Sequence, residues 1–97
     1  DYCLTSSLIL EMYGLRNAND VDYLHKGDNY LEGFGLHSGE WLDYYSKNKD
    51  TIIYNPLNYF YFNGLKFVSL KVVKEMKEKR NEKKDITDLK LISKISI

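Results

Sequence analysis

Asp20 and Asp22 are the residues of this sequence whose type and spacing point most directly to chemistry. We predict a strand over residues 20–25, with Val21 and Tyr23 facing the interior. Residues i and i+2 of a strand point to the same face, so the two carboxylates would project side by side. Mg²⁺ prefers carboxylate oxygens and keeps several waters that substrate phosphates can replace. The pair therefore predicts a divalent-metal site; the alternative is an aspartate-rich turn that leads into a strand.

A polar turn with two hydroxyls, Ser6 and Ser7, lies upstream of the aspartates. It opens a short predicted helix over residues 8–12, and Gly14 suits the left-handed position that ends a helix. The first backbone N–H groups of a helix have no partner within it and attract anions. We interpret the serines as phosphate ligands next to the metal site. Helix N-capping is the alternative interpretation, and both can hold at once.

These features together carry a resemblance. The serine turn, the short helix, the segment Tyr13-Gly14-Leu15-Arg16 and the Asp-x-Asp pair resemble the signature of the polymerase-β-type nucleotidyltransferase superfamily. More narrowly, they are similar to its small AbiEii-like branch of minimal nucleotidyltransferases. A second block is similar to the C-terminal helices of that branch. It consists of residues 74–80, which begin with Lys74 and end with Arg80, followed by Lys84-Asp85-Ile86-Thr87-Asp88-Leu89.

The resemblance implies an activity and a set of roles. The activity is transfer of a nucleoside monophosphate from a nucleoside triphosphate (NTP) to an unknown acceptor hydroxyl, with Mg²⁺ or Mn²⁺ as the cofactor. Asp20 and Asp22 would be the catalytic metal ligands. The residues that would contact the nucleotide are Ser6, Ser7, Arg16 and Lys74. A surface ion pair is the alternative for Arg16, and a helix-capping role is the alternative for Asp85 and Asp88.

The sequence also departs from the superfamily pattern. The superfamily has glycine where this chain has Thr5 or Ser6, because glycine lets the backbone approach phosphates closely. Its members also place a third carboxylate on a later strand as a general base. The strands predicted here for that role, residues 51–54 and 59–62, contain no acid. Two further hypotheses follow: a catalytically degenerate nucleotidyltransferase-fold module that binds or regulates within a larger, possibly polysaccharide-pathway protein, and a structural interaction domain without chemistry.

Length and composition limit the remaining choices. The 97 residues suffice for one domain with a single core, and the missing start methionine suggests a piece of a longer protein with a partner domain. No apolar run is long enough to cross a membrane, and the single cysteine, Cys3, fits a reducing, cytoplasmic compartment. The 14 basic and 14 acidic residues cancel, and nucleic acid is not an expected partner. Bases are concentrated in residues 51–97, and this basic half could face a polyanion. The alternative is that the lysine-rich run from Lys74 to Lys84 is the solvated face of an amphipathic helix and its exit.

The element pattern predicts an α+β fold, a small mixed sheet with helices packed on it, as in a minimal nucleotidyltransferase. Asn63-Gly64 between two aromatic and apolar runs predicts a hairpin of residues 59–62 and 65–68. Ser69 is predicted to cap a long helix over residues 70–81, and Asp85 to cap the final helix. The other predicted elements are a strand over residues 1–5, a short helix over residues 40–45 and a strand over residues 51–54.

Overall fold

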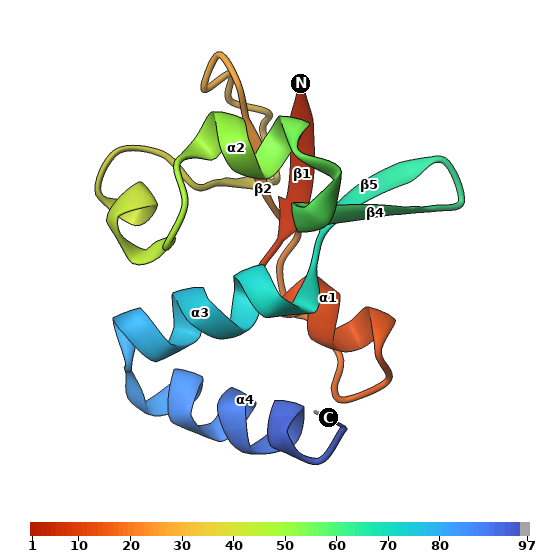
Figure 1. The fold of residues 1–97 in the computed structure, drawn as a ribbon, viewed down its shortest axis with the longest axis vertical. Helices are drawn as coiled ribbons and strands as arrows, with labels where there is room; N and C mark the ends of the chain where they lie inside the picture. Colours follow the sequence, from red (N-terminus) through yellow and green to blue (C-terminus); the bar gives the residue numbers. More distant parts are fainter. Residues whose placement is uncertain (96–97) are drawn as a thin grey trace.

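A five-stranded mixed sheet forms the centre of this α+β fold, seen here in a computed structural model that describes residues 1–95 (Figure 1). The spatial order of the strands is β3-β2-β1-β5-β4. The central strand β1 pairs antiparallel with β2 and parallel with β5. β3 runs parallel to β2, and β4 antiparallel to β5. The bounds are β1 Tyr2–Thr5, β2 Asp22–His25, β3 Gly35–Leu36, β4 Tyr59–Phe62 and β5 Leu65–Val68.

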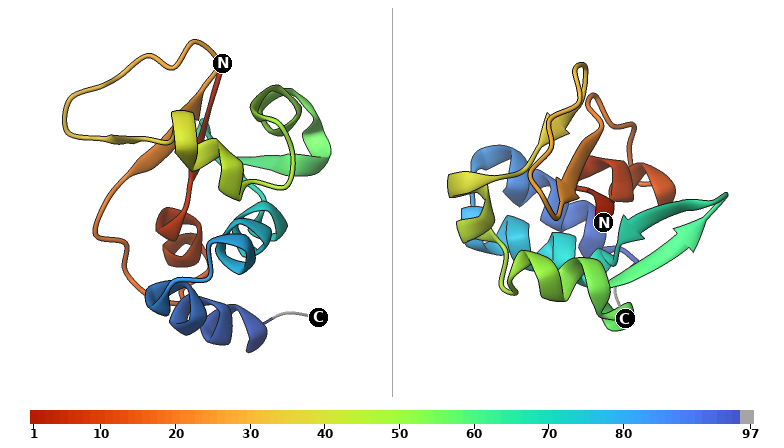
Figure 2. Two further views of the ribbon diagram at one scale, coloured as in Figure 1. Left: turned by 90° about the vertical axis from the view of Figure 1, so that its left-hand side faces the viewer. Right: turned by 90° about the horizontal axis from the view of Figure 1, so that it is seen from above.

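Residues 1–95 contain four α-helices, and the last two lie together at one end of the sheet (Figure 1). Figure 2 shows α4 alongside α3 and the β4–β5 hairpin extending away from the helices. Among residues 1–95, no helix is long and apolar enough to span a bilayer. The helical bounds are α1 Ser7–Met12, α2 Lys49–Tyr54, α3 Leu70–Arg80 and α4 Lys83–Ser93, with 3₁₀ turns η1 Gly39–Tyr44 and η2 Pro56–Asn58.

The core lies on the sheet face that carries Cys3 of β1 and Leu24 of β2, which are register partners and fully buried. Ile52 and Ile53 of α2 and Val73 of α3 belong to the same cluster. The prediction that Tyr23 faces this core is wrong, because Tyr23 lies on the other face, where its hydroxyl donates to the Asn29 carbonyl. Asp22 therefore shares a face with Leu24, at the end of the strand where the core opens to solvent.

Several local predictions are confirmed. The hairpin turns at Asn63 and Gly64, whose φ angles of 50° and 77° are those of a type I′ turn. The Ser69 side chain accepts a hydrogen bond from the Val72 N–H and caps α3. Gly14 adopts the left-handed conformation after α1, with φ 71°.

Three elements differ from the prediction. Residues 51–54 belong to helix α2 and not to a strand, because the Asn48 side chain caps the segment by accepting from the Thr51 N–H. The final helix begins at Lys83, so Asp85 occupies its third position and completes a capping box with Glu82. The second strand begins at Asp22, which leaves Asp20 in the preceding loop.

Candidate functional site

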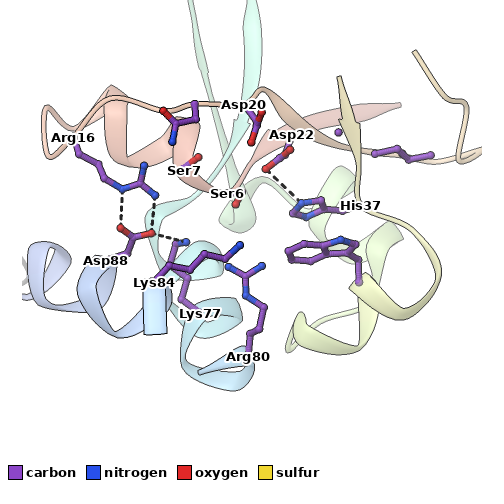
Figure 3. A pocket seen from close by; sticks show the side chains of 14 residues that line it. Ser6, Ser7, Arg16, Asp20, Asp22, His37, Lys77, Arg80, Lys84 and Asp88 are labelled. Atoms are coloured by element: carbon purple, nitrogen blue, oxygen red, sulfur yellow. Dashed lines mark hydrogen bonds and ion pairs between the residues drawn. The ribbon is translucent and has the colours of Figure 1, made fainter. Parts of the chain in front are cut away.

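A cavity of about 280 Å³ opens where the ends of β1 and β2 face helices α3 and α4 (Figure 3). The β1–α1 turn contributes Ser6 and Ser7, and the loop before β2 contributes Asp20. In Figure 3, Asp20 and Asp22 lie on one wall, and Lys77, Arg80 and Lys84 reach toward them from the helices. The cavity thus has an acidic wall and a basic wall.

The acidic wall is built around Asp22. Its side chain is 19% exposed, and its Oδ2 lies 3.6 Å from Nε2 of His37. Gly35 of β3 is the register partner of Asp22. A Cβ atom at Gly35 would collide with the Asp22 carboxylate, so glycine provides the space that this carboxylate occupies. Asp20 is exposed and lines the same cavity from its loop.

A buried chain of two hydroxyls contacts the His37 ring on the side away from the cavity. Its Nδ1 lies 2.7 Å from the Tyr45 hydroxyl, which lies 2.9 Å from Oγ1 of Thr5. Burial raises the pKa of Tyr45 above its ordinary value, so the phenol stays protonated. The imidazole also stacks on the indole of Trp41, with ring centroids 3.9 Å apart. The side chain is therefore fixed with Nε2 toward the cavity.

The basic wall is a network of buried ion pairs. Asp88 accepts two hydrogen bonds from Arg16, at 2.7 and 2.8 Å, and its Oδ2 lies 2.9 Å from Nζ of Lys77. Asp85 accepts two hydrogen bonds from Arg80. The Lys77, Asp85 and Asp88 side chains are at most 3% exposed. Because three cations meet two carboxylates, this network carries one positive charge in excess.

The pKa values of the two buried carboxyls show that they are ionised. Burial by itself raises the pKa of Asp85 and Asp88. The bonds from Arg80 to Asp85, and from Arg16 and Lys77 to Asp88, lower the pKa by more than burial raises it. The pKa of each carboxyl therefore lies below its ordinary value. The excess positive charge at the cavity persists at neutral pH.

The cavity brings together most of the residues predicted from the sequence. Ser6, Ser7, Arg16, Asp20 and Asp22 all line it, from the β1–α1 turn, the start of α1, the loop after α1 and the start of β2. Within the described part of the chain, Lys74 is not among its lining residues; it lies on α3 one turn before Lys77.

Sequence reasoning gave no role at the site to the residues that complete it, which are His37, Lys77, Arg80 and Lys84, although the second block contained Arg80 and Lys84. The interpretation of the lysine-rich run as a solvated face is wrong for Lys77 and Arg80, whose side chains are buried. The signal was present in the second block, because Lys77 and Arg80, and Asp85 and Asp88, are each three residues apart and thus share a helix face. For His37 the sequence held no comparable signal.

The backbone of Ser6 explains the departure from glycine in the turn. Its φ of 63° and ψ of −139° lie in a region that is almost exclusive to glycine. The Ser6 side chain makes no capping hydrogen bond to α1, so N-capping does not account for it. The turn therefore keeps the backbone path of a glycine while it carries a hydroxyl at the cavity.

We expect Ser6→Gly to raise the free energy of unfolding by about 1 kcal/mol, because glycine relieves the strained φ and ψ at a smaller cost in unfolded-state entropy. Urea denaturation measures this change. Ser7→Gly is the matched control, and it should lower stability because Ser7 is already helical. A loss of stability in Ser6→Gly equal to that of the control would contradict the strain at Ser6.

The donor set of the acidic wall fits a hard divalent cation. Across residues 1–95, no three His, Cys, Asp or Glu side chains form a ready-made metal cluster. Mg²⁺ needs no such cluster, because it is commonly held by one or two carboxylates together with substrate phosphates and water. Asp20 and Asp22 on one wall would supply those carboxylates.

These observations describe a polar cavity with opposite walls of opposite charge, in which both carboxylates of the Asp-x-Asp pair are accessible. Comparison of the chain with protein-family models, with curated proteins and with solved structures found no match.

Proposed function

We propose that this domain is a metal-dependent nucleotidyltransferase of the minimal type, which transfers a nucleoside monophosphate from an NTP to an acceptor hydroxyl. One observation carries the proposal. A single cavity places the two aspartates opposite a buried network with excess positive charge, and the serine turn lies beside both. A metal–polyphosphate complex has the matching chemistry, since its metal needs carboxylates and its phosphates need cations and N–H or O–H donors.

The residues divide the work as follows. Asp20 and Asp22 would hold the metal, which polarises the phosphate and neutralises its charge when bound. Lys84, 67% exposed at the cavity, and the excess charge of the network would attract the triphosphate. Ser6 and Ser7 would donate hydrogen bonds to phosphate oxygens. Both hydrogen bonds of Arg16 to a side chain go to Asp88. Its role would therefore be to connect the loop after α1 to the basic wall.

The second candidate function is a nucleotide-binding module that has lost catalysis. The small number of acids at the cavity favours this candidate. Among the described residues these acids are Asp20, Asp22 and Asp88. Asp88 is already paired with Arg16 and Lys77. Within residues 1–95, no further carboxylate lines the cavity that could serve as a general base. The two candidates share the binding site and differ only in whether pyrophosphate is released.

We expect each Mg²⁺–NTP that binds to raise the melting temperature, because a ligand at 100 times its Kd stabilises the native state by about 2.7 kcal/mol. The variant Asp20→Asn/Asp22→Asn should lose this shift and keep or exceed the melting temperature of the unliganded protein, since a carboxylate repulsion is removed. Glu32→Gln/Asp43→Asn removes the same charge from exposed positions and should retain the shift.

Pyrophosphate release in the presence of candidate acceptors then separates the enzyme from the binding module. The absence of a shift with every nucleotide, or an equal shift in the double aspartate variant, would refute the proposed site.

A further inference from the structure

We propose that His37 is a ligand of the metal in this cavity, beside Asp22, and that the site consequently prefers Mn²⁺ to Mg²⁺. This inference rests on the proposed function for the presence of a metal at Asp22. It goes further because it assigns a nitrogen ligand, and with it the choice of ion, to a residue that the Asp-x-Asp pattern does not contain.

The separation of the two donor atoms suits a shared ion. Asp22 Oδ2 and His37 Nε2 lie 3.6 Å apart. Two ligand atoms that are each about 2.1 Å from one ion, at an angle of roughly 90 to 120°, are about 3.0 to 3.6 Å from each other. The pair therefore needs little movement to bind one metal. The loop residue Asp20, the phosphates and water would supply the remaining ligands.

The far side of the imidazole has the arrangement typical of metal-binding histidines. Such histidines use their second ring nitrogen in a hydrogen bond that fixes the tautomer and the ring orientation. Here Nδ1 lies 2.7 Å from the Tyr45 hydroxyl, and that hydroxyl is in turn bonded to Thr5. In the tautomer that leaves Nε2 free for a metal, Nδ1–H donates to Tyr45 and Tyr45 donates to Thr5. The hydroxyl chain accommodates this tautomer.

The imidazole is also preorganised. The His37 side chain is 3% exposed, and its ring is nearly parallel to that of Trp41, at an angle of 8°. Arg80 lies over the same indole, 4.7 Å from its centroid, and is itself bonded to Asp85. The stacking on Trp41 and the bond to Tyr45 therefore hold the ring in this orientation. The Nε2 atom is therefore in position to bind a metal before any ion is present.

The ligand chemistry predicts the preference. Mg²⁺ binds oxygen donors almost exclusively, whereas imidazole nitrogen suits first-row transition ions. At this site Mn²⁺ would use both Asp22 and the imidazole of His37, whereas Mg²⁺ would bind through carboxylate, water and phosphate oxygens and gain little from His37. Mn²⁺ is also the useful probe, because its unpaired electrons couple to a directly bound ¹⁴N nucleus.

The test is binding of Mn²⁺ alone, followed by electron paramagnetic resonance, with pulsed detection of ¹⁴N coupling. We expect ¹⁴N coupling in the wild type and in His25→Gln, since His25 lies on the other face of the sheet at an unrelated hollow. His37→Gln should abolish the coupling and weaken Mn²⁺ binding roughly 10-fold or more. Mg²⁺ binding, measured by competition, should change much less.

Tyr45→Phe serves as a second variant if His37→Gln does not fold. It keeps the ring at position 45 and removes the hydroxyl that holds Nδ1, so Mn²⁺ should bind more weakly while ¹⁴N coupling persists in the bound fraction. Mn²⁺ bound without ¹⁴N coupling, coupling that survives in His37→Gln, or no Mn²⁺ binding with or without NTP would each overturn the inference.

The two proposals fail separately. A melting shift with Mg²⁺–NTP and no ¹⁴N coupling with Mn²⁺ would refute the histidine ligand and leave the nucleotide site. Coupling with Mn²⁺ and no shift with any nucleotide would support the histidine ligand and refute the nucleotidyltransferase.

Discussion

Asp88→Asn is expected to lower the free energy of unfolding by about 3 kcal/mol, since removing one member of a buried ion pair strands its partners. Asp88 is the only carboxylate that Arg16 contacts in the described chain, and it lies closer than Asp85 to Lys77. With asparagine at position 88, the network would hold three cations against one carboxylate. Lys77, 2% exposed, has too little contact with water to compensate.

Urea denaturation of the purified domain measures this effect. Glu78→Gln is the matched control, because Glu78 is an exposed acid on α3 next to Lys77, and its loss should change stability by less than about 0.5 kcal/mol. A change in Asp88→Asn as small as that of the control would mean that water enters the network and that its charges are screened.

Gly35→Ala is expected to weaken metal–nucleotide binding by roughly 10- to 100-fold while it changes stability little. The added methyl group would collide with the Asp22 carboxylate, which is the free end of a side chain and can rotate away. The rotation costs little in folding but takes the carboxylate out of its position in the cavity. The prediction thus separates the geometry of the acidic wall from the stability of the sheet.

Isothermal titration with Mn²⁺–NTP, together with thermal unfolding, tests this prediction. Gly27→Ala is a suitable control, since Gly27 lies in a surface turn and its Cβ would approach the Asn29 side chain at 3.0 Å. In the Asp22→Asn background, Gly35→Ala should have no further effect on binding. Wild-type binding in Gly35→Ala would show that the position of Asp22 does not matter, and would argue against its role as a metal ligand.

Local signals in the sequence were sufficient for the elements that depend on neighbouring residues. The Asn63-Gly64 hairpin and the Ser69 cap require only a turn or a cap and the adjacent residues, so their pattern predicts them correctly. The strand prediction for residues 51–54 failed because it relied on the preference of β-branched residues for strands. The capping Asn48 and the burial of Ile52 and Ile53 against the sheet favour a helix instead.

The sequence predicted the site residues that belong to one local pattern, but not those whose position depends on distant parts of the chain. Ser6, Asp20 and Asp22 belong to one continuous pattern, and the fold brings them to the same cavity. Whether Lys77 is a solvated lysine or a buried charge depends on carboxylates that another helix supplies, and no single-helix periodicity contains that information. His37 follows a two-residue strand that is too short to produce an alternating pattern.

The bidentate bond between Arg16 and Asp88 joins residues 72 positions apart in the chain. During synthesis the aspartates of the acidic wall leave the ribosome before the helix that carries Asp88. Because non-local contacts form only after the intervening chain has been closed into a loop, the cavity is among the last parts of the domain to be assembled. A nascent or truncated chain that lacks α4 therefore keeps the cations Arg16, Lys77 and Arg80 but lacks the carboxylates Asp85 and Asp88 that hold them in place, so the basic wall is ordered only once α4 has packed against α3.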